Sequence, residues 1–195
     1  MKKVKIRVAF FAIVILMFML ISKNEYIFLT LLAVTIHEMG HVIAAWCFKI
    51  EISEFSLSIL GARLKPSNCL TSYYQEILLC SFGPLFNFLT GLSVYYFVNN
   101  RISEKASYFV SASILLGVLN LFPIKSFDGG RILESVLLMF ISPKLVLRLV
   151  KLISFFCIIT LWIVSVYFLL IYTYSLGLFV FSTSLFCNIF IDDSF

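Results

Sequence analysis

The chain has 195 residues, of which 62% are hydrophobic and 13% charged, and its formal net charge is +5. An average soluble domain is roughly 45–50% apolar and about 25% charged, so this chain has too few polar side chains to cover a soluble globule. The same composition excludes a disordered chain. Because a membrane-spanning helix needs roughly 20 apolar residues, the chain has room for about six spans with short loops. We therefore predict an all-α polytopic membrane protein with about six transmembrane helices.

The first apolar run, residues 8–21, follows a basic N-terminus that contains four lysine and arginine residues. This order is similar to that of a secretory signal. The residues after the run, Ser22 to Glu25, contain no small-residue cleavage site. We therefore predict that the run is retained as the first span.

Five further apolar runs follow, at about residues 26–48, 77–98, 106–124, 152–173 and 176–191. Cytoplasmic loops carry an excess of lysine and arginine. With the N-terminus in the cytoplasm, 12 of the 15 basic residues fall on the inner side and 3 on the outer side. This distribution predicts an integral multi-pass protein with both termini in the cytoplasm. The basic residues lie between the apolar runs and do not gather on one face, so nucleic acid is not an expected partner.

Segment 50–66 has a different pattern from the apolar runs. Apolar and serine side chains alternate from Phe55 to Ile59, which is the two-residue period of a strand, and Gly61 and Pro66 interrupt the pattern. We predict a short β-strand or hairpin at the cytoplasmic boundary of the membrane, with an interfacial loop as the alternative. An exposed strand edge can pair with an extended peptide.

The second apolar run contains both histidines of the chain, His37 and His41. Their spacing of four residues places them on the same side of a helix. Glu38 follows the first histidine and completes the pattern H-E-x-x-H. In this arrangement two imidazoles bind zinc, and the glutamate activates a water molecule. The run therefore predicts a zinc site.

The depth of this pattern in the second run strengthens the prediction. His37 lies 11 residues after Tyr26, which corresponds to roughly 16 Å along a helix. A charged carboxylate at the bilayer centre costs roughly 2.5–3.5 kcal/mol even on lenient scales. The alternative is a structural histidine that makes an interhelical hydrogen bond, with Glu38 as its partner. That alternative explains one polar residue but not three at this spacing.

Two histidines leave a catalytic zinc ion short of a third protein ligand. The five cysteines are scattered and form no C-x-x-C pair, so a carboxylate is expected to supply the ligand. The candidates are Glu76, Asp128 and Glu134. Asp128 is the best of them, because Gly129 and Gly130 would let the backbone turn its carboxylate toward a metal. Asp128 could equally cap a helix that begins near Gly130, and both roles are open.

Three motifs on successive apolar runs resemble the site-2 protease family of intramembrane zinc metalloproteases. They are His37–His41 (HEMGH), Gly83–Asn87 (GPLFN), and Asn120–Pro123 (NLFP) followed by Asp128–Gly130 (DGG). The resemblance covers residues 26–135. It implies one zinc ion per chain, bound by His37, His41 and Asp128, with Glu38 as the general base.

The resemblance also bears on two asparagines. It implies that Asn120 helps to hold the substrate or the developing oxyanion. Asn87 lies near the middle of the third run, where a buried amide either hydrogen-bonds a neighbouring helix or lines the substrate path.

Within that family the chain is most similar to the stage IV sporulation protein FB branch. This implies a bacterial cell membrane, a sigma-factor precursor as substrate, and a membrane protein as regulator. We expect one membrane-embedded protease domain over residues 1–195, with a catalytic core at 26–135 and no PDZ or CBS domain. The sequence departs from the branch in two ways. Members of the branch usually have a proline two residues before the aspartate, where this chain has Ser126. They also often carry a C-terminal CBS domain, which is not expected here.

The sequence thus predicts an intramembrane zinc metalloprotease. Its partners would be the lipid bilayer and a membrane-associated protein substrate, which it would cleave in or near a transmembrane segment. The alternatives are a non-proteolytic zinc-binding membrane protein and a metal transporter.

Overall fold

The computed structural model describes residues 5–8, 24–50, 52–58, 61–66, 72–98, 103–171 and 176–191. The chain divides into two compact units, Met1–Leu121 and Phe122–Phe195, and each is described by itself.

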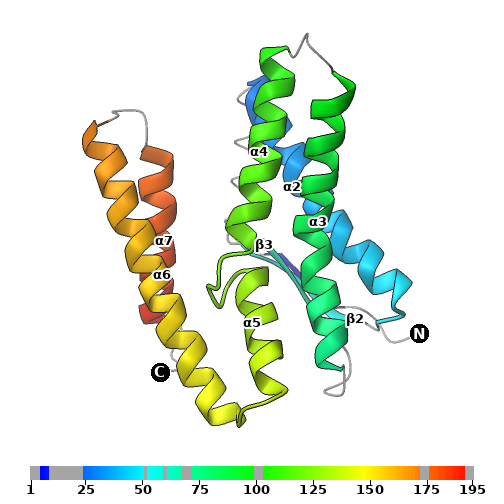
Figure 1. Cartoon of the computed structure of the whole chain (residues 1–195), viewed down its shortest axis with the longest axis vertical. Helices are drawn as coiled ribbons and strands as arrows, with labels where there is room; N and C mark the ends of the chain where they lie inside the picture. The colour runs from blue at the N-terminus through cyan, green and yellow to red at the C-terminus, as the bar shows by residue number, and fades with distance from the viewer. Residues whose placement is uncertain are drawn as a thin grey trace. The chain divides into compact units, whose positions relative to one another are not determined.

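Three packed helices form the main body of the first unit: α2 (Glu25–Cys47), α3 (Tyr73–Phe97) and α4 (Glu104–Asn120). Each of them contacts the other two (Figure 1). They coincide with the apolar runs predicted at 26–48, 77–98 and 106–124. α4 ends before Pro123, because the residue preceding a proline is disfavoured in helical geometry.

The backbones of α2 and α3 touch at Gly40. A Cβ atom at this position would lie 2.5 Å from the carbonyl oxygen of Phe82, closer than real side chains approach. About one turn further along α2, Ala44 and Ala45 pack with Leu79 in the buried core. Small residues allow membrane helices to pack this closely. The result is that one face of α2 lies directly against the backbone of α3.

Polar contacts join the N-terminal ends of α2 and α4. The hydroxyl of Tyr26 donates to Oε1 of Glu104 at 2.9 Å, and Lys105 forms an ion pair with Glu25. The two helices therefore begin at the same end of the unit. In the predicted topology this is the outer end, and that sidedness stays a prediction.

Three strands accompany these helices: β1 (Lys5–Val8), β2 (Ile52–Ser58) and β3 (Gly61–Pro66). They form one sheet in the order β1-β2-β3, with β1 parallel and β3 antiparallel to the central β2. β2 and β3 lie within the segment predicted as a strand or hairpin, whereas β1 is not predicted. The turn that a hairpin requires, residues 59 and 60, lies outside the described residues, so the hairpin stays a prediction.

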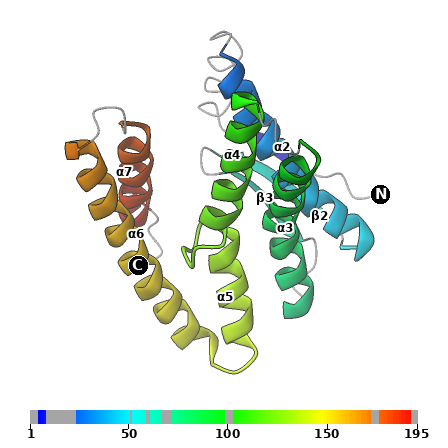
Figure 2. The same cartoon turned by 45° about the horizontal axis from the view of Figure 1, so that its top comes forward.

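The second unit contains α5 (Asp128–Leu138), α6 (Pro143–Ile171) and α7 (Leu176–Ile191). Helices α6 and α7 lie side by side in both views (Figure 1, Figure 2). Their buried contact includes the hydroxyls of Ser165 and Ser182, which lie 2.7 Å apart.

Among the described residues, three helices are long and apolar enough to cross a membrane: α2, α3 and α6. Helices α4 and α7 are shorter, with 17 and 16 residues. The predicted first span, residues 8–21, lies almost wholly outside the described residues. The molecule is thus a helical membrane protein, and the number of six spans stays a prediction.

Candidate metal centre

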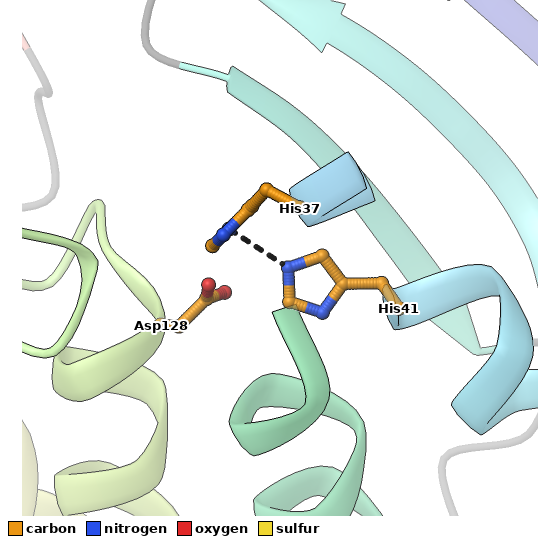
Figure 3. A group of neighbouring side chains, drawn as sticks. All are labelled: His37, His41 and Asp128. Atoms are coloured by element: carbon orange, nitrogen blue, oxygen red, sulfur yellow. Dashed lines mark hydrogen bonds between the residues drawn. The ribbon is translucent and has the colours of Figure 1, made fainter. Parts of the chain in front are cut away.

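The imidazole rings of the two histidines of α2 lie next to each other, as their spacing predicts. His37 and His41 are both buried, with exposed fractions of 4% and 6%. Their Nε2 atoms lie 3.2 Å apart, and their rings meet edge to face (Figure 3). Two ligands at roughly 2.05 Å from one tetrahedral zinc ion would be separated by about 3.3 Å, so this separation fits one ion.

A backbone carbonyl fixes the tautomer of His41. Its Nδ1 atom lies 2.8 Å from the carbonyl oxygen of Leu79 on α3. A carbonyl oxygen only accepts hydrogen bonds, so Nδ1 carries the proton and Nε2 keeps its lone pair. Metal-binding histidines usually have this arrangement, which orients the ring and makes the free nitrogen more basic.

Gly83 provides the space that both imidazoles occupy. A Cβ atom there would lie 2.6 Å from Cε1 of His41 and 2.8 Å from Cε1 of His37, in addition to a closer clash with Nε2 of His41. Real Cβ atoms essentially never show such contacts. The absence of a side chain at Gly83 is therefore what allows α3 to pack against the two histidines.

Replacing Gly83 with alanine is expected to displace the imidazoles and weaken zinc binding at least about tenfold. A loss of this size is typical when a residue that orients a metal ligand is lost. Gly91→Ala on the same helix is the matched control, because a Cβ atom there would meet its nearest neighbours at 3.4 to 3.6 Å, which is ordinary contact. Zinc affinity measured by chelator competition on the purified variants tests this expectation. Equal affinities for the two variants would contradict it.

Glu38 follows His37 directly in the sequence, and its side chain is half-buried on α2. Its role as general base stays a prediction.

Asp128 is the first residue of α5, and only 8% of its surface is exposed. The N-cap position belongs to Phe127, so Asp128 does not occupy the capping position that was its alternative role. Gly130 lies against the carbonyl of Ile124 so closely that a Cβ atom could not fit. A buried carboxylate needs a charged partner or a metal, although a helix N-terminus also favours its charge.

Among the described residues, the side chains that could hold a metal ion are His37 and His41 of the first unit and Asp128 of the second (Figure 3). Two imidazoles and one carboxylate are a donor set found in catalytic zinc sites. The other two carboxylate candidates, Glu76 in the first turn of α3 and Glu134 on α5, are not part of this group.

The two predicted asparagines have different environments. Asn120 is the last residue of α4, and its Nδ2 donates to the carbonyl of Leu116 at 3.1 Å. Asn87 on α3 is fully buried, and its Nδ2 lies 3.2 Å from Nδ1 of His37. A role in substrate or oxyanion binding stays a prediction for both residues.

Comparison with known proteins finds a family model that matches part of the chain and solved structures that are similar to it. The model of Peptidase family M50 matches residues 98–164, which include Asn120 and Asp128 but not the two histidines. No curated protein matches the chain. Among solved structures, the chain is similar to the site-2 protease from Methanocaldococcus jannaschii, with 19% identity and a TM-score of 0.68 over 97% of this chain and 91% of that chain. At this identity the similarity shows a shared fold.

Proposed function

We propose that the chain is an intramembrane zinc metalloprotease, which hydrolyses a peptide bond in or near the transmembrane segment of a membrane-associated protein. The observation that carries the proposal is the buried histidine pair of α2, whose Nε2 atoms lie 3.2 Å apart. The match to Peptidase family M50 indicates a zinc metalloprotease, and the shared fold agrees with it.

His37, His41 and Asp128 would hold one zinc ion. The donor set supports this assignment, as does the Nδ1–H tautomer that Leu79 imposes on His41. Bound zinc would lower the pKa of a water ligand to about 7 and polarise the carbonyl of the scissile peptide bond.

Glu38 would act as general base and then as general acid. Its carboxylate accepts a proton from the attacking water, and the carboxylic acid so formed delivers that proton to the amine that leaves. Burial of both histidines keeps bulk water away from the reacting groups. A low local dielectric strengthens the electrostatic interactions there.

The substrate must present an extended segment. A transmembrane helix engages its carbonyls in its own hydrogen bonds, so the cleaved segment has to unwind first. Asn120 would bind that segment, because its carboxamide uses one N–H for Leu116 and has a second to donate to a substrate carbonyl.

The finer assignment is a protease of the stage IV sporulation protein FB branch, with a sigma-factor precursor as substrate. Its support is the resemblance of the three sequence motifs. In this assignment the protein resides in a bacterial cell membrane with both termini in the cytoplasm.

Removal of the metal tests the proposed function. The chain is reconstituted in lipid vesicles with reporter proteins that each carry one transmembrane helix, including a sigma-factor precursor. We expect a chelator such as 1,10-phenanthroline to stop cleavage and added zinc to restore it, because the proposed mechanism depends on the metal. Cleavage is followed by the appearance of the product on gels.

The alternatives give different results in the same vesicles. A protein that keeps zinc for structure binds the ion but cleaves no reporter. A transporter moves zinc into the vesicle lumen, where an enclosed indicator detects it. Either result without cleavage refutes the proposed protease, and cleavage that persists in chelator refutes the metal mechanism.

A further inference from the structure

The environment of Asn87 raises a specific physical question. The side chain is 0% exposed, and its Nδ2 lies 3.2 Å from Nδ1 of His37, fifty residues away in the sequence. The other polar atom of the carboxamide, Oδ1, is buried without a hydrogen-bond partner. Buried polar atoms are nearly always paired, so an unpaired one requires an explanation.

The explanation lies in the tautomer of His37. A histidine that binds a metal through Nε2 carries its proton on Nδ1 and almost always donates it to an acceptor. His41 has such an acceptor in the carbonyl of Leu79. At the same position of the His37 ring, the neighbour is the carboxamide of Asn87.

The orientation of that carboxamide decides which nitrogen of His37 carries the proton and which keeps its lone pair. With Nδ2 facing the ring, Asn87 donates to Nδ1 and the proton of His37 lies on Nε2. A half-turn of the carboxamide exchanges Nδ2 and Oδ1 with almost no change of shape. Oδ1 then accepts from Nδ1–H, and Nε2 keeps its lone pair for a metal.

We propose that Asn87 is a positioning residue for the metal centre: its carboxamide oxygen accepts the Nδ1 proton of His37 and holds the imidazole in the tautomer that binds zinc through Nε2. α3 then orients both imidazoles of α2, His41 through the backbone of Leu79 and His37 through the side chain of Asn87. This inference rests on the zinc site of the proposed function. Asn87 is fully buried against His37, so the proposed effect passes through His37.

Two substitutions separate the acceptor from the shape of the side chain. Asn87→Leu keeps a similar volume but has no acceptor, and we expect its zinc affinity to fall about 10–100-fold, as is typical when the hydrogen-bond partner of a metal ligand is lost. Asn87→Asp offers only acceptor oxygens, so its affinity is expected to stay within a few-fold of the parent chain. Affinity is measured on the full chain in detergent micelles by zinc competition with a chromophoric chelator.

Ser113→Ala is the matched control. Ser113 on α4 is also 0% exposed, and its hydroxyl has no hydrogen-bond partner, so the variant removes a buried polar atom from the same helical unit. Its zinc affinity is expected to equal that of the parent chain. A loss in Ser113→Ala as large as that in Asn87→Leu would overturn the proposal, because it would show a general effect of packing.

Nuclear magnetic resonance of the ring nitrogens shows which nitrogen of each histidine carries the proton, and a change in packing alone does not alter this. The chain has only two histidines, so its ¹⁵N-histidine spectrum contains few ring signals. In zinc-bound protein we expect Nδ1 of His37 to be protonated. After the metal is stripped, the same tautomer should be more populated in Asn87→Asp than in the parent chain, because a carboxylate cannot donate to Nδ1.

The proposal is overturned if Asn87→Leu binds zinc as tightly as the parent chain, or if Asn87→Asp loses as much affinity as Asn87→Leu. It is also overturned if Nδ1 of His37 carries no proton in the zinc-bound protein. This test uses the parent chain, so it can be made even if the leucine variant fails to fold. None of these readouts involves cleavage. A chain that binds zinc with the expected dependence on Asn87 but cuts no substrate would refute the protease and support the role of Asn87.

Discussion

Replacing Glu38 with glutamine is expected to lower the rate of intramembrane cleavage about 10²–10⁴-fold, the usual contribution of a general base, while zinc remains bound. Glutamine has nearly the same shape as glutamate but cannot take a proton from water at neutral pH. The zinc ligands in our proposal are His37, His41 and Asp128, so the metal content should not change. Cleavage of a transmembrane reporter in vesicles and the zinc content of the same preparations measure the two quantities.

Glu134→Gln provides the control for this substitution. Glu134 is another half-buried glutamate, on α5, and it lies outside the group that could hold a metal. Its variant is expected to cleave the reporter at a rate close to that of the parent chain. If Glu38→Gln retains both zinc and full activity, Glu38 is not the general base and the mechanism proposed here is wrong.

The histidine pair could be predicted because its geometry is local. A spacing of four residues brings two side chains together on any α-helix, and the apolar run around them predicts that helix. The structure confirms the helix over Glu25–Cys47, with the two Nε2 atoms 3.2 Å apart. Nothing beyond one turn of α2 is needed for this prediction.

Of the groups that orient the imidazoles, the sequence suggested only that Asn87 could hydrogen-bond a neighbouring helix, and it did not identify the partner. Leu79 contacts His41 through its carbonyl group, which every residue possesses, so the sequence carries no signal for it. Asn87 and Gly83 belong to the motif GPLFN, yet their roles depend on how α3 packs on α2. Such contacts between residues 38 to 50 positions apart come from tertiary structure, which hydrophobic periodicity does not encode.

The sequence pattern also failed to predict some boundaries of the helices and strands. α6 begins at Pro143, well before the predicted run at 152–173, because a helix accepts the basic residues Lys144, Arg148 and Lys151 that an apolar run excludes. Pro143 itself is suited to the first turn of a helix. Strand β1 has only four residues, and it is defined by pairing with the distant β2.

Replacing Asp128 with alanine is expected to weaken zinc binding more than about 100-fold. Loss of a residue that only hydrogen-bonds a metal ligand already lowers metal affinity about 10–100-fold, and loss of a ligand should lower it further. Cleavage of the transmembrane reporter should disappear with the metal. Glu76→Ala and Glu134→Ala are the matched controls, since these residues are the other carboxylates that the sequence offers as a third ligand. Wild-type zinc affinity in Asp128→Ala, or a comparable loss in either control, would assign the third ligand elsewhere.

A second variant separates ligation from the effect of Asp128 on its helix. A carboxylate in the first turn of α5 interacts favourably with the helix N-terminus, which is worth about 0.3–1 kcal/mol, so alanine also removes some stability that does not depend on zinc. Asp128→Asn keeps the shape of the side chain and loses the charge. Zinc that binds only the folded protein raises its melting temperature, and the increase is larger when zinc binds more tightly. A third-ligand role therefore predicts that Asp128→Asn melts near the parent chain in chelator and loses most of the increase that zinc gives to the parent chain. If zinc raises both melting temperatures equally, the charge of Asp128 stabilises the start of α5 and does not bind the metal.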